Sequence, residues 1–261
     1  MTQTLHQRLG ERLYQALRER KAIAPLTAEY PELTIADAYR IQQCMIDRRL
    51  AATGERIVGK KIGVTSQVVM DMLGVDQPDF GVLTSGMVYN DGAQIAAGEL
   101  IAPKAEGEIA FLLKRDLCGP GIGCADVLAA TELVMPCFEI VDSRIADWKI
   151  KIQDTVADNA SSGVFVIGDA AVDPRRLDLT LTGMTLEKNG QLIGTGAGAA
   201  ALGHPANAVA WLANMLGTLG VTLRAGEIVL SGSLAAMVPV AAGDQLRIGL
   251  SGIGSASVSF I

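Results

Sequence analysis

The chain has 261 residues, of which 49% are hydrophobic and 19% are charged, so it can bury a large core and is not expected to be disordered. Its formal net charge of −6 and the lack of a basic patch argue against nucleic acid and anionic membranes as partners. No apolar run reaches the length of about 18 residues that a membrane helix needs, and the polar, charged segment from Met1 to Lys21 does not resemble a secretory signal.

Cysteine and histidine are scarce. The four cysteines lack C-x-x-C spacing, and a chain of this size does not need disulfides for stability, so we expect reduced thiols and a cytoplasmic protein. Two histidines, His6 and His204, are too few for a three-histidine zinc site. A mechanism with a nucleophile and a histidine base would have to use His204, between Gly203 and Pro205, and is not favoured.

Helices are predicted for the first part of the chain. Leucines recur every four residues from Leu5 to Leu17 with charged residues between them, which predicts an amphipathic helix ending near Lys21. After two chain-breaking prolines, Thr34 or Asp37 begins a second helix with one apolar stripe. We therefore predict a small helical N-terminal lobe over residues 1–55 and a β-rich domain over residues 56–261.

Short β-type segments dominate the second part. The first is Ile57–Ser66, which is followed by a helical turn at Gln67–Leu73 and by a loop of turn-forming residues at Gly74–Gly81. Later helices are predicted at Ala125–Leu133 and Pro205–Gly217. The remaining β-type runs are Val88–Tyr89, Glu108–Leu113, Cys137–Val141, Gly163–Ile167, Leu179–Glu187, Ile228–Leu230, Gln245–Leu250 and Ala256–Ile261.

The glycines indicate how these strands pack. With 29 glycines and many short strands, the chain favours a rolled β core over a doubly wound sheet. Asn189 and Gly190 predict a hairpin turn. The segment Gly194–Ala200 does not match the G-x-G-x-x-G pattern of a nucleotide loop, so we interpret its glycines as sites of close backbone packing.

Three glutamates are the most informative residues of the chain. Glu106 and Glu108 lie in the run K-A-E-G-E-I-A-F-L-L, and Glu139 lies in L-V-M-P-C-F-E-I-V; both runs are typical of buried strands. Residues two apart share one face of a strand, so Glu106 and Glu108 point the same way, and Gly107 leaves space on the other face. Buried carboxylates need a partner, and for three of them a hard divalent cation such as Mg²⁺ or Mn²⁺ is the simplest.

The ordinary alternative is that these glutamates lie on solvated strand faces, as strand glutamates usually do. The apolar flanks and the carboxylate-x-carboxylate spacing argue for burial. From the residues alone, the metal site and the solvated face both remain open.

Two lysines and an aspartate are candidates to assist such a site. Lys60 and Lys61 lie in an apolar strand, so alternation predicts that one points inward and the other toward solvent. An inward lysine near carboxylates can relay protons or hold a substrate carboxylate, whereas two exposed lysines are the ordinary alternative. Asp79, in a loop bounded by glycines, is either a base or a turn residue.

Polar residues also follow the third glutamate. Asp142 and Arg144 come directly after its strand, which predicts a local ion pair or a support for the glutamate. The segment Val156–Gly163, V-A-D-N-A-S-S-G, either offers hydroxyl and N–H groups to a ligand carboxylate or forms a tight polar turn.

These segments together resemble a known family. The motifs are V-G-K-K-I-G-V-T-S, G-V-D-Q-P-D-F-G, P-K-A-E-G-E-I-A-F, F-E-I-V-D-S-R-I-x-D-W, D-T-V-A-D-N-A-S and G-I-G-S-A-S-V. They resemble the 2-oxopent-4-enoate (2-hydroxypenta-2,4-dienoate) hydratases of aromatic meta-cleavage pathways, within the fumarylacetoacetate hydrolase-like superfamily. The resemblance extends over essentially the whole chain.

The resemblance implies a fold and a site. The implied fold is α+β, with a mixed β-roll core of the fumarylacetoacetase-like type and a catalytic domain at residues 56–261. The implied cofactor is Mg²⁺ or Mn²⁺, and the implied metal ligands are Glu106, Glu108 and Glu139. Lys61 matches the catalytic lysine of the family motif, Asp79 matches its loop aspartate, and Ser161 matches a candidate contact to the substrate carboxylate.

The implied reaction is the metal-dependent hydration of 2-hydroxypenta-2,4-dienoate, a small-molecule 2-hydroxydienoate, to 4-hydroxy-2-oxopentanoate. Lys61 would relay protons and Asp79 would orient or deprotonate water, and the sequence leaves these two roles exchangeable. The sister group, the 4-oxalocrotonate (2-oxo-3-hexenedioate) decarboxylases, shares the carboxylates and the lysine and is the alternative. The stretches D-Q-P-D-F-G and A-D-N-A-S-S-G favour the hydratase.

Two further classes are less favoured. A carbon–carbon bond hydrolase of the same superfamily would need a histidine–carboxylate pair, and neither histidine lies in a matching motif. A non-catalytic scaffold for a neighbouring enzyme would not need the complete set of glutamates. The resemblance also implies a complex with 4-oxalocrotonate decarboxylase, and the apolar content predicts a homo-oligomer.

Overall fold

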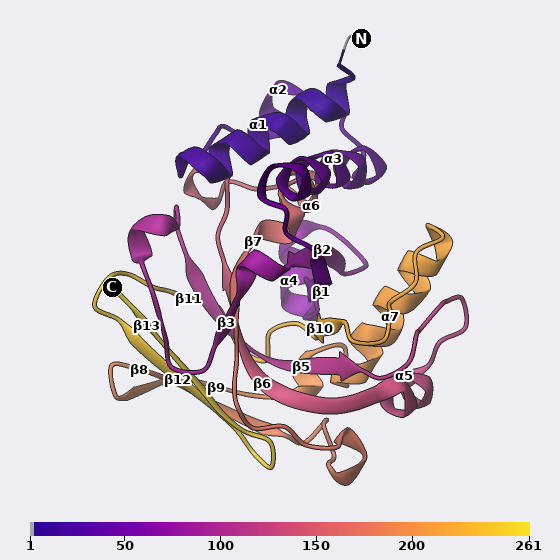
Figure 1. Cartoon of the computed structure of the whole chain (residues 1–261), viewed down its shortest axis with the longest axis vertical. Coiled ribbons are helices and arrows are strands. Elements are labelled where there is room, and N and C mark those ends of the chain that lie inside the picture. Colours follow the sequence, from indigo (N-terminus) through magenta and orange to yellow (C-terminus); the bar gives the residue numbers. More distant parts are fainter. Residues whose placement is uncertain (1–2) are drawn as a thin grey trace.

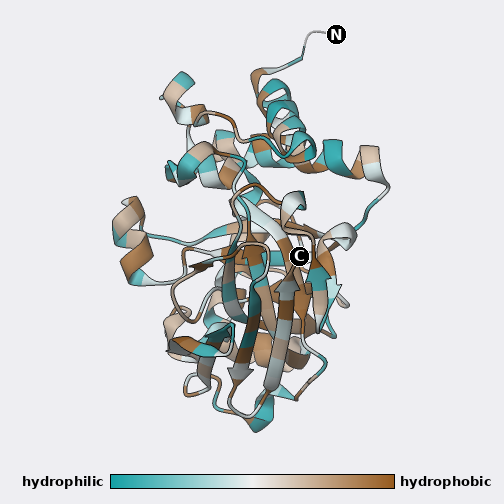
Figure 2. Ribbon diagram, turned by 90° about the vertical axis from the view of Figure 1, so that its left-hand side faces the viewer, coloured by the Kyte–Doolittle hydropathy of each residue, from teal (hydrophilic) through white to brown (hydrophobic). Residues whose placement is uncertain are grey.

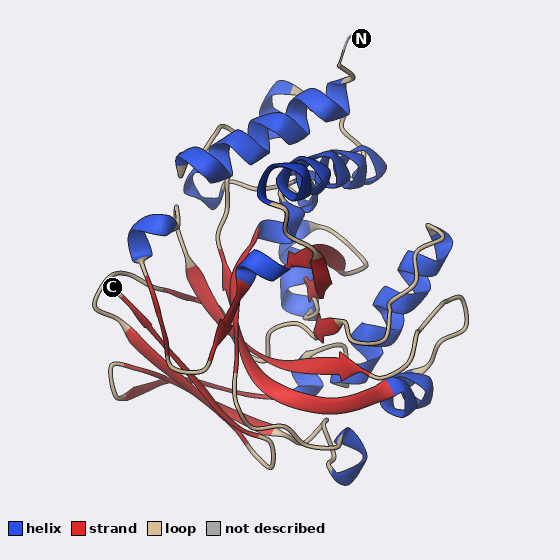
Figure 3. Cartoon of the chain, viewed as in Figure 1, coloured by secondary structure: helices blue, strands red, loops and turns tan. Residues whose placement is uncertain are grey.

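The computed structural model describes residues 3–261, which form two mixed β-sheets with helices around them (Figure 1, Figure 3). The helices are α1 (Leu5–Glu19), α2 (Leu26–Glu29), α3 (Ile35–Thr53), α4 (Gln67–Leu73), α5 (Cys124–Ala130), α6 (Ile152–Ala157) and α7 (Pro205–Thr218). The strands are β1 (Ile57–Gly63), β2 (Asp79–Thr84), β3 (Val88–Asn90), β4 (Ala93–Ile95), β5 (Lys104–Leu113), β6 (Thr131–Val141), β7 (Ser162–Ile167), β8 (Gly183–Lys188), β9 (Gln191–Ala197), β10 (Ile228–Leu230), β11 (Val238–Pro239), β12 (Gln245–Leu250) and β13 (Gly254–Phe260).

Helices α1 to α3 lie together above the sheets, as predicted for the N-terminal part (Figure 1). A capping box between Thr34 and Asp37 begins α3, and Gly54, with a φ of +73°, ends it, because glycine adopts the left-handed conformation without steric cost. Figure 2 shows teal, hydrophilic residues along these helices among brown, hydrophobic ones, the pattern of helices that bury one face.

The apolar faces of these helices pack on a segment far along the chain. Leu9, Leu13 and Ile41 form one cluster with Ile152 and Val156 of α6. The predicted division between residues 55 and 56 falls in the turn between α3 and β1 and stays a prediction. Among residues 3–261, no helix is both long and apolar enough to cross a bilayer.

The larger sheet has the order β2-β1-β10-β5-β6-β7-β3, with β11 added beside β5. The smaller sheet has the order β4-β13-β12-β8-β9. Parallel and antiparallel pairs occur in both sheets, for example β1 parallel to β10 and antiparallel to β2. The α+β fold with a mixed β core that the resemblance implied is therefore confirmed.

The main core lies between the two sheets and α7. Gly107 of β5 shows how closely the sheets approach, since a Cβ atom there would lie 2.5 Å from Met184 Sδ of β8 and 3.0 Å from Ile248 Cγ2 of β12. The space that Gly107 was predicted to leave opposite the glutamates is thus filled by the second sheet. A side chain at this position would require Met184 to move out of the way.

Several local predictions are confirmed and others are wrong. The Asn189–Gly190 turn joins β8 to β9, and Gly196 and Gly198 contact the backbone of other segments closely. The predicted loop at Gly74–Gly81 ends in a strand, because β2 starts at Asp79 and is buried along its length. The predicted helix at Ala125–Leu133 ends at Ala130, since the following residues pair with β5.

Candidate active site

The three predicted glutamates meet on one face of the larger sheet. Glu106 of β5 lies directly opposite Glu139 of β6, and Glu108 is two residues further along β5. One carboxylate oxygen from each lies within 4.8 Å of the others. Glu108 and Glu139 are fully buried, and Glu106 is half-buried. The structure thus places these side chains together and not on a solvated face.

The glutamate oxygens lack partners that their burial requires. Glu108 Oε2 accepts a hydrogen bond from the Gly232 amide at 2.8 Å, but Glu108 Oε1 and both oxygens of Glu139 accept none. Burial, and then repulsion by Glu139, raise the pKa of Glu106 to about 7, and the same two causes raise the pKa of Glu108 well above its ordinary value. Unpartnered carboxylate oxygens of this kind fit a hard divalent cation, which would neutralise their repulsion.

Lys61 extends from β1 into the same cluster. Its Nζ lies 3.2 Å from Glu139 Oε1, an ion pair without hydrogen-bond geometry, and the residue is only 3% exposed. Burial alone would lower the pKa of Lys61, but the surrounding carboxylates, with Glu139 first, outweigh burial and raise it. Lys61 is therefore a buried ammonium beside the glutamates.

Lys60 does not point to solvent, so that part of the prediction is wrong. It lies on the opposite face of β1 and is 6% exposed, with its Nζ 3.8 Å from Glu227 Oε1. Burial lowers its pKa. Residues 59–62 of β1 are buried whichever face of the strand they occupy, so alternation places Lys60 and Lys61 in two different buried environments.

Asp79 lies at the first position of β2, opposite Gly63 of β1. A Cβ atom on Gly63 would lie 2.2 Å from Asp79 Oδ1 and 3.5 Å from Lys61 Nζ, so both functional groups approach this glycine. Asp79 Oδ1 is buried without a hydrogen-bond partner. Burial raises the pKa of Asp79 although the Lys61 charge opposes it.

Ser161 ends a strained turn just before β7. Asn159, Ala160 and Ser161 all have left-handed backbone conformations, with φ values of 57°, 50° and 53°, and such a run of non-glycine residues persists only where its surroundings hold it. The Asn159 amide exchanges two hydrogen bonds with the Val82 backbone of β2. Ser161 Oγ lies 3.2 Å from Thr155 Oγ1. The predicted contact of Ser161 with a substrate carboxylate stays a prediction.

The predicted local ion pair between Asp142 and Arg144 is wrong. The Arg144 guanidinium pairs with Asp158 instead, and it also donates to the backbone carbonyls of Asp142 and Ser162. The Asp142 carboxylate accepts hydrogen bonds from the backbone amides of residues 101 and 102. Arg144 therefore joins the end of β6 to the turn that carries Ser161, a pairing between segments that sequence spacing does not indicate.

Replacing Arg144 with Met is expected to lower the free energy of unfolding by about 3–5 kcal/mol, because Asp158 would remain as an uncompensated buried charge. Urea denaturation would measure this loss. The exposed pair of Arg175 with Asp173 supplies the control, and Arg175→Met should change stability by no more than about 0.5 kcal/mol. Equal losses in the two variants would contradict a structural role for the buried pair.

Sequence reasoning missed two groups beside the glutamates. The Gly232 amide comes from the loop after β10, where φ is +98°, and the buried Ser162 Oγ, which has no other partner, lies near Glu139. The signal for Gly232 was the S-G-S run of small residues at 231–233, and Ser162 lies in the segment Val156–Gly163 that was predicted to offer hydroxyl groups. A cavity of about 630 Å³, lined by Glu106, Ser233 and Val68 among others, gives access to the cluster.

Comparisons with known proteins agree with this arrangement. The fumarylacetoacetate hydrolase C-terminal family matches residues 61–260. A 2-hydroxyhexa-2,4-dienoate hydratase from Comamonas testosteroni is 60% identical over 253 residues, which cover 96% of this chain and 96% of that protein. A 2-hydroxypent-2,4-dienoate hydratase from Pseudomonas putida is 64% identical over 222 residues, which cover 85% of this chain and 100% of that protein. The solved structure of a 4-oxalocrotonate decarboxylase from Pseudomonas putida G7, complexed with magnesium and adipate, is 40% identical, with a TM-score of 0.95 over 100% of this chain and 99% of that chain.

Proposed function

The chain belongs to the fumarylacetoacetate hydrolase family, and from this premise we propose that it is a hydro-lyase that hydrates 2-hydroxypenta-2,4-dienoate to 4-hydroxy-2-oxopentanoate in aromatic catabolism. The observation that carries the proposal is the cluster of Glu106, Glu108 and Glu139, with Lys61 and Asp79 beside it, in a chain that shares most of its residues with hydratases. Neither histidine reaches this cluster. His6 pairs with Asp37, and His204 caps α7, so a histidine-dependent hydrolase is not supported.

We propose that the three glutamates hold Mg²⁺ or Mn²⁺. Their oxygen donors suit hard divalent cations, and their unpartnered atoms explain why a cation would be required. When bound, the ion would supply Lewis-acid stabilisation of negative charge on the substrate oxygens. The cavity at Glu106 would admit the substrate with its carboxylate and 2-oxygen toward the glutamates.

The protein side chains would then carry the proton transfers. The buried Lys61 ammonium is placed to stabilise developing negative charge and to relay the proton that the dienoate gains at C5. Asp79 Oδ1 has no partner and is free to accept a hydrogen bond from the water that adds to C4. Ser161 would contact the substrate carboxylate. Burial of Glu108, Glu139 and Lys61 would limit the access of other water to the reaction.

Decarboxylation of 4-oxalocrotonate is the second candidate, because the solved decarboxylase shares the fold over the whole chain. The two reactions differ at the far end of the substrate, where the diacid carries a second carboxylate. The glutamates and Lys61 serve either reaction, so the assay and not the metal site must separate them.

We expect chelator-treated protein to lose activity and to regain it with Mg²⁺ or Mn²⁺. Ultraviolet assays with 2-hydroxypenta-2,4-dienoate and with 2-oxo-3-hexenedioate would follow both reactions. Metal-dependent loss of the dienol absorbance, with 4-hydroxy-2-oxopentanoate formed, supports the hydratase. Carbon dioxide released from the diacid alone would replace it with the decarboxylase, and full activity after complete metal removal would contradict the metal proposal.

The predicted homo-oligomer and the predicted complex with 4-oxalocrotonate decarboxylase remain proposals, as does the cytoplasmic location. The oligomer rests on the apolar content of the chain, the complex on its resemblance to the hydratase family, and the location on cysteines that lack C-x-x-C spacing.

A further inference from the structure

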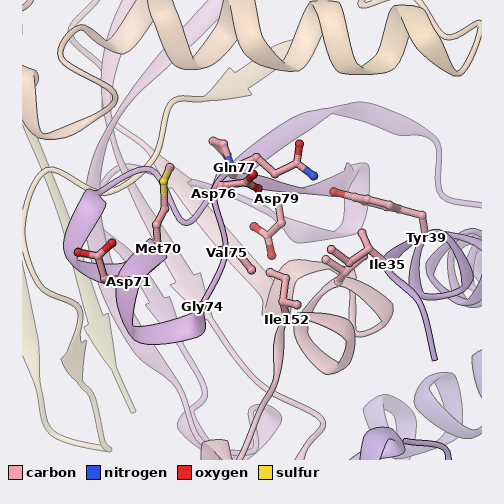
Figure 4. Close-up of a pocket in the computed structure, with 12 residues that line it drawn as sticks. Ile35, Tyr39, Met70, Asp71, Gly74, Val75, Asp76, Gln77, Asp79 and Ile152 are labelled. Carbon is pink, nitrogen blue, oxygen red and sulfur yellow. The ribbon is translucent and has the colours of Figure 1, made fainter. Parts of the chain in front are cut away.

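A second cavity, of about 650 Å³, is lined by Asp79 and by none of the three glutamates. Its walls come from α3, α4, α6 and the loop before β2. Figure 4 shows the Asp79 carboxylate pointing between Val75 and Ile152, with the Tyr39 ring and Ile35 reaching in from α3. The volume falls within the range of about 300–1,000 Å³ that is typical of small-molecule sites. We call this space the tail pocket.

Aliphatic and acidic side chains line the tail pocket together. Ile35, Val75, Ile152 and Val156 supply aliphatic surface, and Asp71, Asp76 and Asp79 supply carboxylates. None of its lining residues, all within the described part of the chain, is a lysine, arginine or histidine. Such a lining disfavours a carboxylate, which would meet acidic residues and no opposing cation, and its aliphatic side chains can contact a neutral alkyl group.

The Tyr39 ring makes one wall rigid. It stacks on Phe80 of β2, with ring centroids 4.5 Å apart and 18° between the ring planes. Burial, and then the nearby Asp79 charge, raise the pKa of the Tyr39 hydroxyl, so the hydroxyl stays neutral beside the carboxylate. The helical N-terminal part thus contributes directly to a space that begins at a catalytic side chain.

The proposed reaction gives the tail pocket a role. With the substrate carboxylate and 2-oxygen at the glutamates, and with C4 and C5 near Asp79 and Lys61, a substituent on C5 would extend past Asp79. We propose that the tail pocket binds a neutral alkyl substituent on C5 of the dienoate, and that Ile35 and Val75 set the length that is accepted. This inference rests on the proposed hydratase function and goes beyond it, because it places chain-length selection on α3 and on the loop before β2.

The test compares kcat/KM for the parent dienoate and for its 5-ethyl homologue in the metal-loaded full-length protein. Each buried methylene contributes roughly fourfold to binding, so filling the pocket should remove about tenfold or more of the relative activity toward the homologue. We expect Val75→Phe and Ile35→Phe each to lower the ethyl-to-parent ratio by this amount. The smaller Ile35→Ala should raise the relative activity toward a 5-propyl homologue.

Leu181→Phe is the control, because Leu181 is 75% exposed and lines neither this pocket nor the cavity at Glu106. It should leave the ratio unchanged. A ratio that falls with Leu181→Phe and not with the tail-pocket variants would overturn the inference, and so would a ratio that none of the three tail-pocket variants alters. Circular dichroism and thermal unfolding would identify a variant that fails to fold, in which case Ile35→Ala still decides. A wild-type protein that turns over no dienoate would instead refute the proposed function itself.

Discussion

Glu106→Gln is expected to remove metal binding and activity together while leaving the metal-free protein at least as stable as the wild type. A lost metal ligand removes several kcal/mol of transition-state stabilisation, and each 1.36 kcal/mol is a factor of ten, so kcat/KM should fall on the order of 10³-fold or more. The free energy of unfolding of the metal-free protein should not fall, because Glu106 is a buried group that Glu139 repels. A neutral glutamine removes that repulsion.

Two measurements separate these effects. Calorimetric titration with Mn²⁺ should show no binding to Glu106→Gln at concentrations that saturate the wild type. Thermal unfolding in chelator should show a midpoint no lower than that of the wild type, whereas the rise that Mn²⁺ causes in the wild type should be absent.

Glu132→Gln is the control for Glu106→Gln, since Glu132 lies on β6 with an exposed side chain that pairs with Lys114. It should keep metal binding and activity. A Glu106→Gln protein that is active without metal would rule out the proposed site.

Lys61→Met is expected to lose turnover and keep its metal. General acid–base groups contribute about 10²- to 10⁴-fold, and Lys61 is the only cation within ion-pair distance of Glu139 among the described residues. Loss of its positive charge leaves the carboxylate cluster more negative, so Mn²⁺ should bind with unchanged or higher affinity. Single-turnover rates and calorimetric titration would measure the two properties separately.

Lys60→Met is the neighbouring control. Lys60 faces Glu227 on the other side of β1, so its replacement should reduce stability and leave turnover near the wild-type value. An inactive Lys60→Met protein beside an active Lys61→Met protein would show that the roles of the two lysines have been exchanged.

The residues of the two strands indicated the glutamate cluster but left the solvated face open, and the resemblance to the hydratase family decided for the metal site. Strand alternation placed Glu106 and Glu108 on one face, and the apolar flanks indicated burial. The direct pairing of Glu106 with Glu139 followed once both runs formed adjacent strands. The caps of the N-terminal helices were also predictable, because a capping box such as that of Thr34 and Asp37 depends on residues only three positions apart.

Other features were decided by tertiary structure. The burial of Lys60, the strand position of Asp79 and the pairing of Arg144 with Asp158 all depend on segments that are distant in the sequence. The tail pocket likewise needs α3, α6 and the loop before β2 to meet. The physical reason is that local periodicity determines which face of an element a side chain occupies, whereas the groups opposite that face come from long-range packing. The sequence therefore determined the chemistry of the glutamates, and only the fold decided what surrounds them.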